Sequence, residues 1–70
     1  MIKIKLDEVL KERNVSLTEL SNAVNVTIAN LSILKTGKAK AVRFSTLEAI
    51  CNYLDCQPGH IIVNQKDDVG

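Results

Sequence analysis

The chain has 70 residues, a formal net charge of +1 and hydrophobic residues at 46% of its positions. A chain this short makes one small domain that buries only about 60% of its unfolded surface, so we expect a single domain over residues 1–70. The composition excludes a disordered chain, and no apolar run approaches the roughly 18 residues of a membrane span. Because the first residues also lack a signal-peptide pattern, we expect the chain in the cytoplasm, with no membrane partner.

The residues that usually carry metal or covalent chemistry are scarce. Cys51 and Cys56 lie outside any C-x-x-C pattern, and His60 is the only histidine, whereas a zinc site needs about four ligands. We expect two reduced cysteines with Cys51 in the core, since free Cys behaves as a small hydrophobe. The sequence shows no catalytic pair at workable spacing and no glycine-rich phosphate loop. We therefore predict no metal, no cofactor, no small-molecule ligand and no enzymatic activity.

The two ends of the chain carry short apolar segments. Ile2 and Ile4 alternate with lysines, which is the period of a half-buried strand. The only candidate partner is Ile61–Val63, so the two ends could form a small ladder. From Leu6 the apolar spacing becomes helical and predicts a first helix that ends near Arg13. We expect the polar tail over about residues 64–70 to fray.

Residues 17–35 have the pattern of two short helices joined by a tight turn. Ser16 and Glu19 have the spacing of a capping box at the start of the first helix. Asn25 suits the turn because Asn tolerates a left-handed backbone. Two capped helices separated by so short a turn predict a helix-turn-helix over about residues 17–35.

The second helix of this unit is expected over residues 28–35, with Thr27 as its cap and Gly37 as its end. At about 100° per residue, Leu31 and Leu34 point to the core. The opposite side is small and uncharged. It is predicted to present Ala29, Ser32, Ile33 and Thr36, with Ile28 and Lys35 on its flanks.

A basic loop over residues 38–43 follows. Ser45 and Glu48 then have the spacing of another capping box, which predicts a helix starting at Ser45. Pro58 suits the first position of a short final helix. The core-facing positions predicted for the helix after the loop are Leu47, Ile50, Cys51 and Leu54.

The stretch NVTIANLSILKTGKAKAVRFSTLEAICNYLDCQPGHII resembles the Xre-like, Cro/cI-type helix-turn-helix regulators, most closely their minimal single-domain members. In that family a capped recognition helix is followed by G-K, a basic loop, R-F-S-T-L-E-A-I/L-C and L-D-C-Q-P-G-D-I/L-L. The resemblance covers roughly residues 6–63. The matching positions are Gly37–Lys38, 43–51 and 54–59, with His60 where an acid is usual.

This resemblance implies an all-α, lambda-repressor-like bundle of four to five short helices, to which the terminal ladder could be added. It also implies one helix-turn-helix DNA-binding domain over residues 1–70, with double-stranded DNA as its partner. The departures from the family lie on the surface that would read DNA. Leu17 replaces a usual Gln, and Ile28, Ala29 and Ile33 replace the usual polar residues of the recognition helix.

The positive charge is concentrated in the middle of the chain, because no acid occurs between Glu19 and Glu48. Phosphate contacts supply most of a DNA-binding protein's affinity, and helix N-termini can add backbone N–H donors. The alternative interpretation of the cations is a solvated basic loop. The predicted phosphate contacts are Ser16, Thr27, Lys35, Lys38, Lys40 and Arg43.

Base readout is expected from the outward side of the second helix of the unit. Asn30 can pair with adenine and Ser32 with several bases, whereas the apolar side chains can meet only thymine methyl groups. Partial core packing is the alternative for Ile28, and contact with another protein is the alternative for Ile33. The predicted base-reading residues are Thr27, Ile28, Ala29, Asn30, Ser32 and Ile33.

These features predict a DNA-binding transcriptional regulator that inserts helix 28–35 in the major groove and places loop 38–43 on phosphates. One subunit offers few base contacts, so we expect a homodimer that reads two half-sites about 34 Å apart. Our first hypothesis for its interface is Ile61–Val63. The alternative function is a protein-interaction module on the same fold, antitoxin-like or an accessory subunit, that uses Ile28 and Ile33 as its contact.

Overall fold

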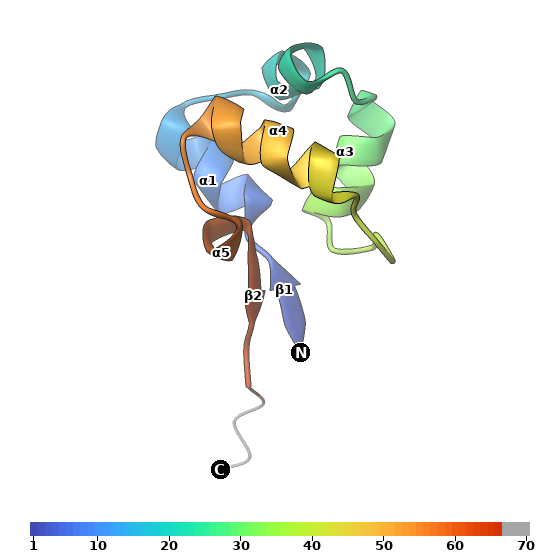
Figure 1. Cartoon of the computed structure of the whole chain (residues 1–70), viewed down its shortest axis with the longest axis vertical. Helices are drawn as coiled ribbons and strands as arrows, with labels where there is room; N and C mark the ends of the chain where they lie inside the picture. The colour runs from blue at the N-terminus through green and yellow to red at the C-terminus, as the bar shows by residue number, and fades with distance from the viewer. Residues whose placement is uncertain (67–70) are drawn as a thin grey trace.

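The computed structural model describes residues 1–66, which form a bundle of five short helices with a two-stranded ladder projecting from it (Figure 1). The predicted helical bundle with a ladder between the chain ends is therefore confirmed. In chain order the elements are β1 (Ile2–Ile4), α1 (Leu6–Arg13), α2 (Leu17–Val24), α3 (Ile28–Lys35), α4 (Phe44–Leu54), α5 (Pro58–Ile61) and β2 (Ile62–Asn64).

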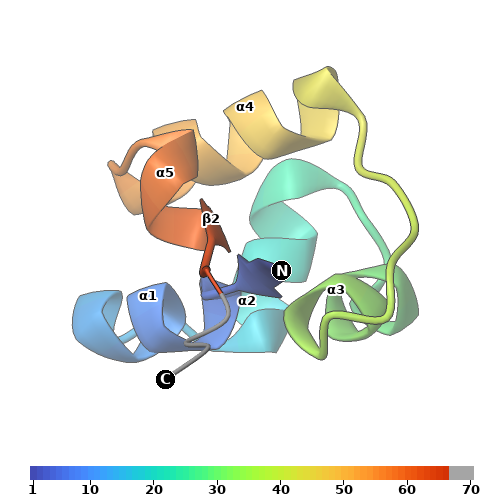
Figure 2. The ribbon, with the colours of Figure 1, turned by 90° about the horizontal axis from the view of Figure 1, so that it is seen from below.

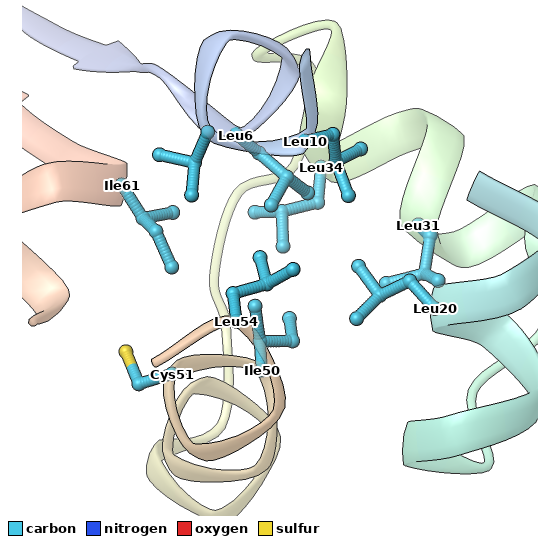
Figure 3. Packing of buried hydrophobic residues seen from close by; sticks show 10 residues of the cluster. Leu6, Leu10, Leu20, Leu31, Leu34, Ile50, Cys51, Leu54 and Ile61 are labelled. Carbon is cyan, nitrogen blue, oxygen red and sulfur yellow. The ribbon is translucent and has the colours of Figure 1, made fainter. Parts of the chain in front are cut away.

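One apolar core lies where the five helices meet, and every helix contributes to it. Figure 3 shows α4 directing Ile50 and Leu54 toward Leu6 of α1, while Leu20 of α2 faces Leu31 of α3. No polar side chain is buried within residues 1–66, so the interior of the bundle is held by apolar packing. The buried residues are Leu6, Val9, Leu10, Leu20, Leu31, Leu34, Ile50, Cys51, Leu54 and Ile61.

The helix starts within the helix-turn-helix lie where the sequence predicts them. The Ser16 hydroxyl oxygen accepts a hydrogen bond from the Glu19 N–H (3.0 Å), and that of Thr27 accepts one from the Asn30 N–H (3.1 Å). Each cap satisfies a backbone donor that has no partner inside its helix. Asn25 ends α2 in the left-handed conformation, with φ of 57°. The capping box at Ser16 forms in one direction only, because the Glu19 carboxylate bonds elsewhere.

Gly37 ends α3, as predicted. Its φ of +78° lies in the left-handed region, which glycine adopts without a Cβ penalty. The Gly37 N–H donates to the Leu34 carbonyl (3.0 Å) and the Lys38 N–H to the Ile33 carbonyl (3.1 Å). This pair of bonds is a Schellman motif, which satisfies carbonyls at the helix end. The chain leaves α3 at Lys38 and begins the basic loop.

The predicted start of α4 at a Ser45 cap is wrong. The helix begins at Phe44, with Arg43 in the cap position and no side-chain cap. The Leu47 N–H donates to the Arg43 carbonyl at 3.0 Å, a helical bond that a cap at Ser45 would leave out. The longer helix therefore gains backbone hydrogen bonds at the expense of the Ser45 side-chain cap.

The ladder at the chain ends is antiparallel, with Ile4 opposite Ile62 and Ile2 opposite Asn64. The predicted partner strand is shifted by one residue, because Ile61 ends α5 and is fully buried in the core. The beginning of the predicted frayed tail is paired as well, since the Gln65 N–H donates to the Met1 carbonyl (2.8 Å). The rest of that prediction, for residues 67–70, lies outside the described residues.

Arg13, the last residue of α1, holds the end of α4. Its Nε donates to the Leu54 carbonyl (2.8 Å) and one terminal nitrogen to the Asp55 carbonyl (3.3 Å). A cation at a helix C-terminus satisfies unpaired carbonyls and complements the negative end of the helix dipole. This contact fixes α1 against α4, and so supports the frame on which α2 and α3 are carried.

Truncating the core beneath the helix-turn-helix should destabilise the whole protein. We expect Leu20→Ala to lower the free energy of unfolding by about 2–5 kcal/mol, because Leu20 is fully buried and its loss leaves a cavity. Ile33→Ala on the exposed face of α3 is the control and should change it by no more than about 0.5 kcal/mol. Urea denaturation measures both variants. Equal effects of the two substitutions would contradict the arrangement of the core.

Candidate nucleic-acid interface

The turn between α2 and α3 is held by hydrogen bonds across it. The Ser21 hydroxyl donates to the Val26 carbonyl (2.5 Å), and the Val26 N–H donates back to the Ser21 carbonyl (3.3 Å). The left-handed Asn25 between them reverses the chain. Because these groups close the turn on both sides, α3 leaves α2 in a fixed direction. The predicted helix-turn-helix is thus a rigid unit.

The burial pattern of α3 separates an inner side from an outer one. Leu31 and Leu34 are buried, as predicted, and face the core. Ile28 and Ile33 are 47% and 46% exposed, and neither is among the partly buried side chains that pack against the core. Of the other predicted base-reading residues, Thr27, Ala29 and Asn30 are exposed and Ser32 is half-buried.

The predicted phosphate contacts fall into two groups. Lys38, Lys40 and Arg43 are exposed in and beside the loop that joins α3 to α4, which Figure 2 shows passing along the outside of the bundle. Over residues 1–66 none of the three is in an ion pair with a carboxylate. Lys35 instead lies against α1, where its Nζ is 3.7 Å from an oxygen of Asp7.

A hollow of about 620 Å³ lies between α3 and the loop. It is lined by Thr27, Asn30 and Ile33 from the helix-turn-helix, and by Lys40 and Arg43 from the other side. The fold therefore brings predicted base readers and predicted phosphate contacts to one concave surface. Its two walls are of different character, one carrying small polar and apolar groups and the other carrying cations.

Ser16 and Lys35 lie apart from this surface. They line a second hollow, of about 420 Å³, together with the carboxylate-bearing Asp7 and Glu19. An anion that approached the N-terminus of α2 would meet these acids, whose negative charge opposes it. The charge distribution thus favours the loop side of α3 over the α1 side.

The start of α4 belongs to the concave surface too, although the sequence pattern did not indicate it. Arg43 occupies the cap position without a side-chain acceptor for the first N–H groups of the helix. These donors and the positive end of the helix dipole lie beside Arg43, which lines the hollow together with Thr46 of the same helix. Phe44, at the first helical position, is 88% exposed. The capping-box spacing of Ser45 and Glu48 predicted a later helix start, so Arg43 was not recognised as the cap residue.

The concave, positively charged surface beside a rigid helix-turn-helix is matched by sequence similarity. Residues 5–67 match the Cro/C1-type HTH DNA-binding domain. The chain belongs to the Cro/C1-type HTH family. It is also similar to the uncharacterized HTH-type transcriptional regulator YozG of Bacillus subtilis (strain 168), with 58% identity over 67 residues that cover 96% of this chain and 80% of the relative. The family resemblance inferred from the motifs is confirmed.

Membership of the Cro/C1-type HTH family places the chain in a non-enzymatic class, as predicted. Among residues 1–66 no group of His, Cys, Asp and Glu side chains could hold a metal ion. Burial raises the pKa of the Cys51 thiol, and the neighbouring Cys56 acts in the same direction. A raised pKa disfavours the thiolate, which is the reactive form. In the same part of the chain, no helix is long and apolar enough to span a bilayer.

One contact between side chains far apart in the sequence joins α2, the first helix of the helix-turn-helix, to α4. The Tyr53 hydroxyl donates a hydrogen bond to the Glu19 carboxylate on α2. This hydrogen bond raises the pKa of Tyr53 above its ordinary value of 10.0, and desolvation and the negative charge of Glu19 act in the same direction. The contact fixes the first helix of the unit against the bundle.

The Tyr53–Glu19 contact predicts a shifted phenol titration. A folded-state pKa above the unfolded value means that the contact stabilises the fold below about pH 10. That stability is lost as the pH rises through the folded-state pKa. Tyr53 is the only tyrosine and the chain has no tryptophan, so the ultraviolet absorbance of the phenolate reports this residue alone.

We expect Glu19→Gln to lower the pKa of Tyr53 toward its ordinary value, because the neutral amide no longer opposes ionisation of the phenol. Glu48→Gln, an exposed substitution on α4, is the control and should leave the titration unchanged. An unchanged Tyr53 titration in Glu19→Gln would show that the contact is not made in solution.

Proposed function

We propose that this protein is a DNA-binding transcriptional regulator that places α3 in the major groove and the loop over residues 38–43 on the phosphate backbone. The observation that carries this proposal is the concave surface on which α3 and the cations meet. A groove-facing helix flanked by phosphate contacts is the docking geometry of helix-turn-helix proteins. Membership of a DNA-binding family and the regulator name of a relative support it. A regulator of this kind would act in the cytoplasm.

The phosphate contacts are assigned by charge and exposure. Lys38, Lys40 and Arg43 are exposed and free of acid partners within residues 1–66. Lys35 is the weakest member of the predicted set, because Asp7 offsets its charge. The N-terminal N–H groups of α3 at Thr27 add donors without a charge. Ser16 would contribute backbone N–H donors in the same way at the start of α2, although the negative charges of Asp7 and Glu19 nearby would oppose a phosphate there.

The polar base contacts are assigned to the first turns of α3. Asn30 is exposed on the concave surface. Its side-chain amide can pair with adenine in the bidentate manner, the NH2 group donating to N7 and the amide oxygen accepting from N6–H. The Thr27 hydroxyl already accepts from the Asn30 N–H, which leaves its proton and one lone pair for a further contact. Ser32 is half-buried and reaches outward less. These polar side chains place few base contacts on one subunit.

We infer a homodimer on DNA for the same reason, since two copies on half-sites about 34 Å apart would double the contacts. The first hypothesis for the interface, Ile61–Val63, does not hold for Ile61. Ile61 is fully buried in the core, and Ile62 lies opposite Ile4 in the ladder. The alternative role of this strip, packing against the N-terminal strand, accounts for it.

A protein-interaction module remains the second candidate function. The observation in its favour is the apolar outer side of α3, where Ile28 and Ile33 are each nearly half exposed. Most single exposed apolar residues need no special explanation. The salt dependence of DNA binding distinguishes the two functions, because an apolar protein contact does not release counterions.

Fluorescence titration of duplex DNA at several salt concentrations tests the regulator. Each phosphate contact contributes about 0.9 to the slope of log affinity against log salt, so Lys38→Ala should lower this slope by about that amount. Lys3→Ala on β1 removes one positive charge at a position outside the concave surface and serves as the control. Failure of every duplex to bind with salt dependence would overturn the proposal in favour of the interaction module.

Light scattering of the free protein and of its complex with DNA tests the dimer. We expect two protein chains on one duplex, because each chain supplies only one recognition helix. A complex that holds a single chain at saturating protein concentration would contradict the homodimer, while leaving the DNA-binding proposal intact.

A further inference from the structure

The outer side of α3 lacks the charged side chains that discriminate G·C base pairs. Guanine is read by Arg or Lys at O6 and N7, and cytosine N4 is read by an acid. The only charged side chain on α3 is Lys35, which is directed to Asp7 on α1. No acid occurs anywhere between Glu19 and Glu48. The charged groups that discriminate a G·C pair are therefore absent from this helix, whose uncharged polar side chains are Asn30 and Ser32.

What the helix does present is apolar and rigid. Ile28 and Ile33 are the two large side chains on its outer side, 47% and 46% exposed. A β-branched side chain in a helix has one strongly preferred χ1 rotamer, so little conformational freedom is lost when it is covered. In the major groove the only apolar group on a base edge is the C5-methyl of thymine. Asn30, exposed on the same helix, is suited to adenine.

We propose that α3 reads A·T base pairs, with Ile28 and Ile33 covering thymine C5-methyl groups and Asn30 hydrogen-bonding adenine. This inference rests on the proposed function and specifies the class of DNA that the same surface takes. The sites it binds are thus rich in A·T pairs at the positions that face α3. Loss of a thymine methyl weakens binding without any change in base pairing.

The charge beside Ile33 favours DNA over a protein as the group that covers this side chain. Ile33 lines the same hollow as Lys40 and Arg43, and Lys38 is exposed at the end of the helix. A surface that is apolar on one wall and cationic on the other complements a groove with methyl groups on its floor and phosphates on its rim. An apolar protein partner would leave these cations without a counterpart.

A second consequence concerns methylated DNA. The C5-methyl group of 5-methylcytosine occupies the same edge of the major groove as that of thymine. Ile28 and Ile33 therefore cover it equally well, although Asn30 finds no adenine beside it. A G·C pair facing α3 gains affinity when its cytosine is methylated at C5.

The test begins with selection of bound sequences from a random duplex pool. The selected duplex is then synthesised with deoxyuridine in place of thymine, one half-site position at a time. Deoxyuridine keeps the base pair and removes only the methyl, so we expect about a fourfold loss of affinity for each methyl that is covered. Deoxyuridine outside the half-sites is the control for changes in DNA shape and should have no effect.

Protein variants assign the methyl contacts to residues. In Ile33→Ala the loss on deoxyuridine substitution should disappear at one position, and in Ile28→Ala at another, because the partner of the methyl is gone. Both residues are exposed, and urea denaturation verifies that the variants fold. Lys38→Ala should weaken binding to the thymine and deoxyuridine duplexes by the same factor.

The outcomes separate this inference from the function it rests on. If no duplex binds, the DNA-binding proposal falls, and capture of a protein by the wild type but not by Ile33→Asp would identify the apolar face as a protein contact. If the thymine and deoxyuridine duplexes bind equally well with a normal salt dependence, DNA binding stands and the methyl readout is overturned. A selected half-site of G·C pairs would overturn it too.

Discussion

The burial of Leu31 and Leu34 is the constraint on which the rest of the interface depends. They are the only buried side chains of α3, and they lie about one turn apart. Two anchors one turn apart fix the rotation of the helix about its axis, because each further residue is turned by a set angle. The outward direction of Ile33 and the position of Ile28 on a flank of the helix follow from that packing. The packing of Leu31 and Leu34 on the buried side of α3 therefore determines which side chains the helix exposes.

The features that could be predicted from the sequence are those with a local signature. The caps at Ser16 and Thr27 and the turn at Asn25 each depend on residues within a few positions of one another. The contacts that brace the helix-turn-helix have no such signature. Tyr53 and Glu19 are 34 residues apart, and Arg13 and Leu54 are 41 residues apart. Such pairs are created by the packing of the helices and cannot be found from spacing.

The errors at the interface have a related cause, which is a local pattern with a competitor elsewhere in the fold. Ser45 and Glu48 fit a capping box, but the carbonyl of Arg43 is close enough to begin the helix earlier. Lys35 belongs to a run of cations in the sequence, but α1 brings Asp7 to within 3.7 Å of it. The fold thus brings several of the predicted site residues to one concave surface and places Ser16 and Lys35 away from it, beside acids that the sequence pattern did not pair with them.

The low net charge of +1 limits how this protein can find DNA. Long-range steering depends on the summed field of the whole molecule, which the acids at both ends of the chain nearly cancel. Attraction from Lys38, Lys40 and Arg43 acts within a Debye length of about 8 Å at physiological salt. In the docking proposed above, these cations would therefore hold DNA only after it has reached the concave surface. Because α3 would enter the groove at the same distance, affinity and base selection would act together.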